Sequence, residues 1–195
     1  MKKLVIASNN QGKLREIQSL LAPLNIEVLP QSALNITEAA EPHCTFIENA
    51  LAKARHASQH TGLPALADDS GLCVTALQGA PGVHSAYYGG EPRSDAKNNA
   101  HLLSALKNVS NRAAYYYCAL VLVRAHDDPQ PIITEGVWTG EILNAPRGTG
   151  GFGYDPLFLD ASLGKTGAEL DAATKNKISH RGHALQQLMI KIKAL

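Results

Sequence analysis

Apolar residues recur along the chain with two different spacings, and these spacings predict its helices and strands. Between residues 14 and 24, leucine and isoleucine return every three or four positions, which is the spacing of an amphipathic helix. Residues 114–124 form a continuous aromatic and aliphatic run, which is typical of a strand. By these criteria we expect strands at 4–7, 26–29, 63–67, 114–124 and 132–143. We expect helices at 14–24, 45–60, 94–106 and 182–195.

The helix at 45–60 has the clearest boundaries. Thr45 and Glu48 form an S/T-x-x-E capping box at its start, and Gly62 follows it as a typical C-terminal residue. Helices connect some of the predicted strands. Residues 114–124 and 132–143 are instead separated by an Asp-Asp-Pro-Gln turn that is typical of a hairpin. Both kinds of connection together predict an α/β protein with a mixed sheet.

Composition narrows the class of protein. A chain of 195 residues fits one domain or two tightly joined lobes. Its net charge of +1 gives no field that would attract nucleic acid or an anionic membrane, so any anion site is local. The three cysteines lack C-x-x-C spacing, which argues against a zinc site or a disulfide framework. The apolar runs are too short for a signal peptide or a membrane span, and we expect a soluble cytoplasmic protein.

Two adjacent aspartates, Asp68 and Asp69, follow the apolar run at 63–67 and precede Ser70 and Gly71. Paired carboxylates at the end of a buried strand suit magnesium, which takes one or two protein carboxylates and completes its shell with phosphates and waters. The small residues after them let a phosphate or sugar approach the backbone. A structural interpretation competes with this one, because acidic residues after a strand are often turn formers or helix caps.

Residues 8–13, Ser-Asn-Asn-Gln-Gly-Lys, lie between a predicted strand and a predicted helix. Backbone N–H groups and the helix dipole favour a phosphate at such a position, and Lys13 adds a positive charge. The segment is not a Walker A loop, because Leu14 stands where that motif has a hydroxyl residue. An ordinary turn with an exposed lysine explains the same residues.

The glycine-rich loop at 148–155 is a candidate base-binding segment. Phe152 and Tyr154 flank Gly153 and offer an aromatic face, and Asp155 accepts hydrogen bonds from a base or a sugar. The alternative is that the two aromatic residues belong to the core beside a flexible hinge.

The basic segment at 175–182 also has two interpretations. In the first, His180 and Arg181 recognise an oxygen on a base by hydrogen bonding, since arginine donates hydrogen bonds but does not accept them. In the second, the segment is a solvent-exposed basic surface, which is the more usual role of a run of basic residues.

Six motifs resemble the ITP/XTP pyrophosphatase family in their order and spacing. They are Ser-Asn-Asn-x-Gly-Lys at 8–13, Thr-Phe-x-Glu-Asn-Ala at 45–50, Ala-Asp-Asp-Ser-Gly-Leu at 67–72, Gly-Ala-Pro-Gly-Val at 79–83, Gly-Gly-Phe-Gly-Tyr-Asp-Pro at 150–156 and Ser-His-Arg-Gly at 179–182. Each motif alone is weak, but the six together extend over nearly the whole chain.

The resemblance implies a hydrolase acting on acid anhydrides that converts deaminated purine nucleotides (ITP, dITP and XTP) to the monophosphate and pyrophosphate, and so removes them from the nucleotide pool. It implies magnesium as the cofactor. It also implies a long mixed sheet flanked by helices, with two lobes around a central cleft. The chain is then one domain over residues 1–195 whose lobes are not separable, forming a homodimer. Its ligand is a small-molecule purine nucleotide, with neither nucleic acid nor membrane as a partner.

Carried over motif by motif, the resemblance also implies roles for single residues. Asp69 is the proton acceptor and a metal ligand. The residues implied in substrate binding are Ser8, Asn9, Asn10, Gln11, Gly12, Lys13, Ser70, Phe152, Gly153, Tyr154, Asp155, Lys175, His180 and Arg181. The family usually supplies a second metal ligand as the first glutamate of a Glu-Glu pair. Ala40 stands at that position here, so either Glu41 takes over as the ligand through a shifted loop, or the metal relies on Asp68, Asp69 and the phosphates.

Two other functions stay open from the sequence. A Maf-like pyrophosphatase acting on pyrimidine or modified nucleotides is one, and a panel of nucleoside triphosphates distinguishes it. A non-catalytic nucleotide- or RNA-binding module is the other. The low net charge and the lack of alternating basic and aromatic residues argue against that module.

Overall fold

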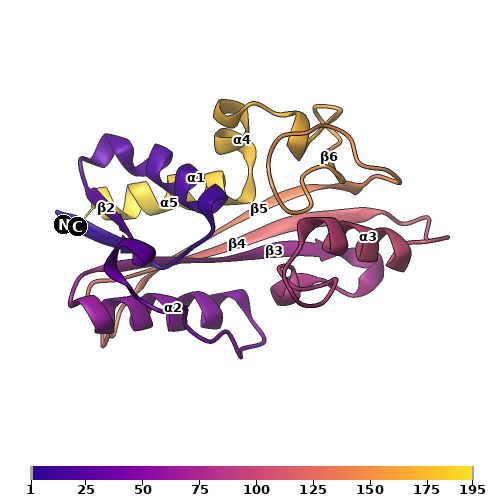
Figure 1. Cartoon of the computed structure of the whole chain (residues 1–195). Coiled ribbons are helices and arrows are strands. Elements are labelled where there is room, and N and C mark those ends of the chain that lie inside the picture. Colours follow the sequence, from indigo (N-terminus) through magenta and orange to yellow (C-terminus); the bar gives the residue numbers. More distant parts are fainter. Residues whose placement is uncertain (1, 195) are drawn as a thin grey trace. The chain divides into compact units, whose positions relative to one another are not determined.

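A seven-stranded sheet with the order β2-β1-β3-β4-β5-β6-β7 organises the chain in a computed structural model, which describes residues 2–194 (Figure 1). The strands are β1 (Lys3–Ile6), β2 (Glu27–Pro30), β3 (Ala65–Val74), β4 (Ala113–Val123), β5 (Ile132–Ile142), β6 (Phe158–Asp160) and β7 (Lys165–Thr166). The α-helices are α1 (Gln11–Leu21), α2 (Phe46–Thr61), α3 (Asp95–Ala105), α4 (Ala172–Ile178) and α5 (His180–Lys193). Short 3₁₀ helices lie at Ala22–Leu24, Gln31–Leu34, Thr75–Leu77, Gly82–His84 and Gly167–Glu169.

The sheet is mixed, as the sequence predicts. β1 pairs in parallel with β2 and with β3, and helices α1 and α2 occur in the connections between these strands. β6 pairs antiparallel with β5 and with β7. The predicted α/β class is therefore confirmed.

The chain divides into two compact units that share the long strands β3, β4 and β5. The first unit contains residues 1–69, 118–136 and 181–195, and the second contains residues 70–117 and 137–180. The expected cleft between two inseparable lobes stays a prediction. Within residues 2–194, none of the helices has the length and apolar character needed to cross a membrane.

In the first unit, helices cover both faces of the sheet. Leu4 and Ile6 of β1 are fully buried in a cluster with Ile17 of α1 and Leu185 of α5. Figure 1 shows α1 and α5 on one side of the first strands and α2 on the other. Three of the α2 positions that face inward are alanines, and small side chains let the helix approach the sheet closely. These alanines, Ala50, Ala54 and Ala57, are fully buried.

In the second unit, the core is aromatic. Tyr116 of β4 packs against Phe158 of β6 with ring centroids 4.7 Å apart, and Trp138 of β5 packs against the same Phe158 at 4.8 Å. Helix α3 adds Leu102, which is fully buried in this cluster. These contacts form a rigid support for the glycine-rich loop that precedes β6.

Several elements differ from the sequence-based expectation. Helix α1 begins at Gln11 rather than at residue 14, because the Asn10 side chain caps it. Strand β3 continues to Val74 instead of ending before the aspartates. Helix α4 was not expected; Asp171 caps it by accepting a hydrogen bond from the Thr174 backbone N–H.

Candidate active site

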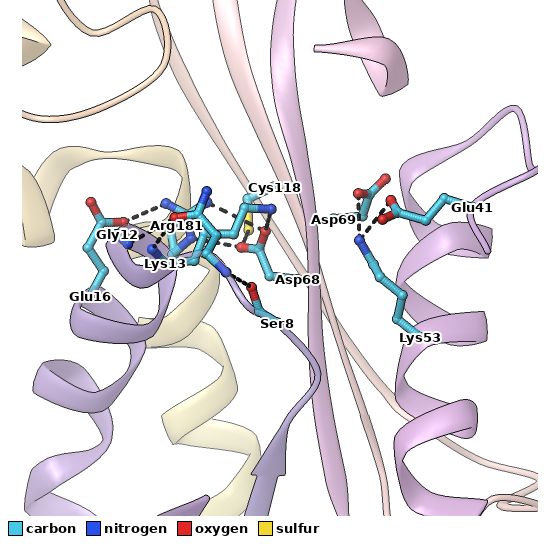
Figure 2. Close-up of polar contacts among 11 residues, drawn as sticks. Ser8, Gly12, Lys13, Glu16, Glu41, Lys53, Asp68, Asp69, Cys118 and Arg181 are labelled. Carbon is cyan, nitrogen blue, oxygen red and sulfur yellow. Dashed lines mark hydrogen bonds and ion pairs between the residues drawn. The ribbon is translucent and has the colours of Figure 1, made fainter. Parts of the chain in front are cut away.

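Asp68 and Asp69 lie inside β3, and their side chains point to opposite faces of the strand. Successive side chains of a strand alternate between the two faces, so neighbouring residues are separated by the backbone itself. Figure 2 shows Asp68 directed toward Lys13 and Arg181, and Asp69 directed toward Lys53 and Glu41. The expectation that two carboxylates at the end of a strand meet at one cation is therefore wrong. The two aspartates belong to two separate clusters in the first unit.

Asp68 is the centre of a buried cluster of charges. It is 1% exposed and accepts a hydrogen bond from Arg181 Nε at 2.8 Å. Lys13 forms an ion pair with Oδ1, whereas the Cys118 thiol donates at 3.2 Å to Oδ2, the oxygen that Arg181 Nε also contacts. Arg181, itself 1% exposed, also donates from Nη1 to Glu16 of α1 at 2.5 Å. Two cations and two carboxylates therefore balance one another away from water.

The charges around Asp68 keep it ionised. Burial raises the pKa of Asp68, but the adjacent Arg181 and Lys13 outweigh this effect and hold the pKa well below its usual value. Burial likewise opposes the charged form of Arg181, yet Asp68 and Glu16 raise its pKa well above the usual value. The cluster thus fixes the Lys13 side chain, which is 16% exposed, at one position at the start of α1.

The predicted phosphate-binding segment, residues 8–13, forms the turn between β1 and α1. Asn10 Oδ1 accepts hydrogen bonds from the backbone N–H groups of Gly12 at 2.9 Å and Lys13 at 3.2 Å. Ser8 Oγ accepts one from the Asn10 N–H at 3.2 Å, and Asn9 donates to Glu38 at 2.9 Å. Side chains of the segment itself therefore cap the helix N-terminus. A phosphate approaching this turn competes with the Asn10 side chain for the same donors.

Asp69 forms the second cluster with two residues from other elements. The Lys53 ammonium, on α2, donates to Asp69 Oδ1 at 2.8 Å and to Glu41 Oε2 at 2.9 Å. Asp69 is 5% exposed, and its second oxygen, Oδ2, has no hydrogen-bond donor among the described residues. Burial raises the pKa of Asp69 to about 6, against the opposing effect of the Lys53 and Lys13 charges.

The other two members of this cluster are charged. Burial raises the pKa of Glu41, but the charge of Lys53 outweighs it and the pKa lies below the usual value. Burial lowers the pKa of Lys53, but Asp69 and Glu41 reverse this effect and raise it. The Lys53 ammonium donates to both carboxylates, which shows that this position attracts positive charge.

The donor set of this cluster fits a magnesium ion. Within residues 2–194 there is no group of three or more His, Cys, Asp or Glu side chains arranged to hold a metal. Magnesium needs only one or two carboxylates when phosphates and waters supply the rest of its shell. Asp69 and Glu41 provide two carboxylates, and Asp69 Oδ2 is a buried oxygen that lacks a donor. The residues present therefore match a metal that binds together with its substrate.

The second unit contains the candidate base-binding residues. Asp155, 2% exposed, accepts from Lys175 Nζ at 2.6 Å and from the Phe152 N–H at 2.8 Å. The Lys175 ammonium also lies 4.7 Å from the centre of the Phe152 ring, which is a cation–π contact. A β-carbon on Gly151 would collide with the Asp155 carboxylate, so only glycine fits there. Phe152 is half-buried and Tyr154 is buried.

His180 lies in the same unit, at the first position of α5. Its ring stacks on Tyr116 with centroids 4.6 Å apart and an angle of 8° between the planes. Ser70 is half-buried in β3, directly after Asp69. Arg181 follows His180 in sequence but belongs to the first unit, where it contacts Asp68.

Several residues of these clusters were not identified from the sequence. Lys53 lies three residues after the buried Ala50, on the flank of the inward face of α2. Glu16 was missed, although its position three residues after Lys13 places the two side chains on one side of α1. Cys118 is buried and donates to Asp68, a contact that the spacing of the cysteines does not indicate.

The chain is similar to known proteins over nearly its whole length. The model of the Ham1 family matches residues 4–191. A dITP/XTP pyrophosphatase of Nitrosomonas europaea is 65% identical over 189 residues, which are 97% of this chain and 93% of the relative. A dITP/XTP pyrophosphatase of Ralstonia nicotianae is 61% identical over 196 residues, which are 99% of this chain and 98% of the relative.

Solved structures agree with the sequence relatives. A HAM1 protein from Coxiella burnetii superposes with a TM-score of 0.93 at 48% identity, covering 100% of both chains. A nucleoside-triphosphatase / dITP/XTP pyrophosphatase from Mycobacterium abscessus gives a TM-score of 0.76 at 39% identity, covering 96% of this chain and 98% of that one. The resemblance drawn from the six motifs is confirmed.

Proposed function

Because the chain belongs to the Ham1 family, we propose that it is a dITP/XTP pyrophosphatase, which hydrolyses deaminated purine nucleoside triphosphates to the monophosphate and pyrophosphate. The observation that carries this proposal is Asp69, a buried carboxylate with one oxygen that lacks a donor and with a pKa raised to about 6. A base of this kind suits the activation of water near neutral pH.

Magnesium is the proposed cofactor, with Asp69 and Glu41 as its protein ligands. When bound, the ion supplies positive charge that stabilises the leaving pyrophosphate. The buried Asp69 carboxylate and the exposed Glu41 carboxylate around one ammonium support this assignment, because the same negative potential that holds Lys53 favours a divalent cation. The absence of Glu at position 40 does not remove the second carboxylate, since Glu41 reaches the Lys53 ammonium that Asp69 also binds.

Asp69 is the proposed proton acceptor. With a pKa of about 6 it is mostly ionised at pH 7, yet it is more basic than an ordinary aspartate. Hydrogen bonding through Oδ1 to Lys53 fixes the carboxylate and directs the remaining oxygen away from the ammonium. A positioned base of this kind contributes on the order of 10²–10⁴ in rate.

The triphosphate is assigned to the turn at residues 8–13. Lys13 supplies a fixed positive charge there because Asp68 holds its side chain, and Asp68 is in turn held by Arg181. Positioning of this kind lowers a barrier without any covalent step by the protein. Ser70 is included among the proposed phosphate contacts because it follows Asp69 in β3.

The base and sugar are assigned to Phe152, Gly153, Tyr154, Asp155, Lys175 and His180 of the second unit. A half-buried ring next to a lysine ammonium offers a surface for stacking and a donor for a carbonyl oxygen. Inosine and xanthosine carry a carbonyl at position 6, where adenosine carries an amine. The role of Arg181 in reading this carbonyl stays a prediction, and its bonds to Asp68 and Glu16 support a positioning role.

A pyrophosphate-release assay with a panel of substrates tests the proposed function. We expect magnesium-dependent turnover of dITP, ITP and XTP, with kcat/KM for ATP lower by up to roughly 10⁴, because a site built for a hydrogen bond rejects the analogue that lacks it. Preference for dUTP or TTP would instead support a Maf-like pyrophosphatase, which the family match does not favour. A chain that releases no pyrophosphate from any of these would overturn the proposal.

The resemblance further leads us to propose a cytoplasmic homodimer. Light scattering coupled to size-exclusion chromatography measures the assembly directly. A mass near twice 20.8 kDa supports the dimer, and a mass near 20.8 kDa contradicts it.

A further inference from the structure

The first turns of α3 hold Gly153 of the glycine-rich loop by both of its backbone polar groups. Asp95 Oδ2 accepts a hydrogen bond from the Gly153 N–H at 2.7 Å. Asn99 Nδ2 donates one to the Gly153 carbonyl at 2.9 Å. Asp95 and Asn99 are four residues apart, so a helix places them on the same side, one turn above the other. Ser94 caps this helix and fixes where it begins.

Gly153 is the residue of the loop that most needs such support. Its φ is +63°, in the left-handed region that glycine enters readily, and a β-carbon there would meet no atom within 4 Å. Steric contact with neighbouring atoms therefore does not fix the conformation of Gly153. Two side chains of α3 do so, and one of their two hydrogen bonds is strengthened by the carboxylate charge of Asp95.

The same helix also supports the next residue of the loop. The Tyr154 hydroxyl donates to the Ser85 carbonyl at 2.8 Å. Asn98 of α3 donates to the carbonyls of Ser85 at 3.3 Å and Ala86 at 3.0 Å. Helix α3 thus holds Gly153 directly and Tyr154 through the segment at residues 85–86. The Phe152 ring, whose stacking role was proposed above, is attached to the part of the loop that α3 fixes.

Asn99 also buries the oxygen of its side-chain amide. Its Oδ1 atom is buried and has no hydrogen-bond partner among the described residues. Burying an amide oxygen without a partner is unfavourable, and a leucine at this helix position would avoid that penalty. An asparagine here is better explained by the hydrogen bond it gives to the loop than by packing.

We propose that Asp95 and Asn99 are positioning residues that set the base-binding loop, and with it the affinity for the purine, without touching the triphosphate. The proposal rests on the proposed function, in which Phe152 stacks on the base. Both residues act through Gly153. Their loss loosens the loop, so the nucleotide binds more weakly, while the groups that carry out hydrolysis are unchanged.

The test is steady-state kinetics of Asn99→Leu and Asp95→Leu with dITP. We expect KM to rise about fivefold to tenfold, as for the loss of one hydrogen bond, with kcat within about twofold of wild type. Inhibition by inorganic triphosphate, a probe without a base, is expected to keep its inhibition constant. Asp95→Asn retains an acceptor oxygen and is expected to restore most of the affinity. Lys97→Gln, at an exposed position of the same helix, is the matched control.

The outcomes separate the two proposals. An unchanged KM in both leucine variants would overturn the positioning role. So would an equal rise in the inhibition constant for inorganic triphosphate, since that indicates general damage to the fold. Thermal unfolding of each variant identifies such damage independently. A wild-type chain that fails to hydrolyse dITP would overturn the proposed function and this inference together, whereas active wild-type protein with unaffected variants overturns the inference alone.

Discussion

Replacing Arg181 with methionine would leave the buried Asp68 carboxylate with Lys13 as its remaining cation. The change removes two hydrogen bonds to Asp68, at 2.8 and 3.5 Å, and the bond from Nη1 to Glu16. Breaking a buried pair by deleting one partner typically costs about 3–5 kcal/mol, because a charge is left uncompensated in a poorly polarisable interior. Since Lys13 remains, we expect a loss near the lower end, about 3 kcal/mol.

Urea titration and thermal unfolding followed by circular dichroism measure this loss. For a chain of this length, about 3 kcal/mol corresponds to a fall in Tm of roughly 6–12 °C. The double variant Arg181→Met with Asp68→Asn is the control. It removes the stranded charge, so it should be more stable than Arg181→Met alone despite carrying one more substitution. A double variant that is less stable than the single variant would refute the argument from uncompensated charge.

The pH dependence gives an independent check. Arg181 and Lys13 hold the pKa of Asp68 well below its usual value even though burial raises it. A carboxylate with a lowered pKa stabilises the fold above its unfolded-state pKa and loses that contribution as pH falls through the folded value. Without Arg181 the pKa of Asp68 rises, so neutralising it becomes easier. The stability deficit of Arg181→Met should therefore shrink as the pH falls toward the ordinary pKa of an aspartate, and a deficit that is constant with pH would contradict this.

Three further predictions follow from the other clusters. Asp69→Asn should lower kcat by about 10²–10⁴ with Tm nearly unchanged, and kinetics near those of wild type would remove Asp69 from its role as the base. Lys53→Met, measured by metal-free thermal unfolding, should lose more stability at pH 8 than at pH 5. Burial raises the pKa of Asp69, and with the opposing charge of the ammonium the pKa lies at about 6, so the ammonium stabilises the fold most when that carboxylate is charged; equal losses at both pH values would argue against this pairing. Gly151→Ala should lower Tm more than Gly153→Ala. Both positions have positive φ, but only at Gly151 would the new methyl collide with Asp155; equal losses would show that backbone strain alone decides.

Sequence patterns predicted helix boundaries well where the residues that determine them are neighbours in the chain. The Thr45 and Glu48 capping box and Gly62 delimit α2 as expected, since capping depends on residues within one turn. The Asn10 cap was a local signal that was interpreted as part of a turn, and as a result α1 begins three residues earlier than expected.

The environment of the aspartates was not predictable by such patterns. A strand was expected to end before Asp68, because a carboxylate is seldom buried. It is buried here because Arg181, 113 residues away in sequence, supplies a compensating charge. No short-range pattern encodes that pairing. The residues of the site were identified through the resemblance, whereas their separation into two clusters became visible only in the structure.

The register of β3 decides which of two identical side chains lies where the proposed base is needed. Val5 pairs with Ala65 and Ile6 with Leu66, and the pleat then sends one carboxyl toward a guanidinium and the next toward an amine. Sliding the strand by a single position would turn both carboxyls to the opposite faces, so that the proposed base would lie on the side of the guanidinium instead of the amine. The tandem acids are therefore not a redundant pair, because each faces a different set of partners.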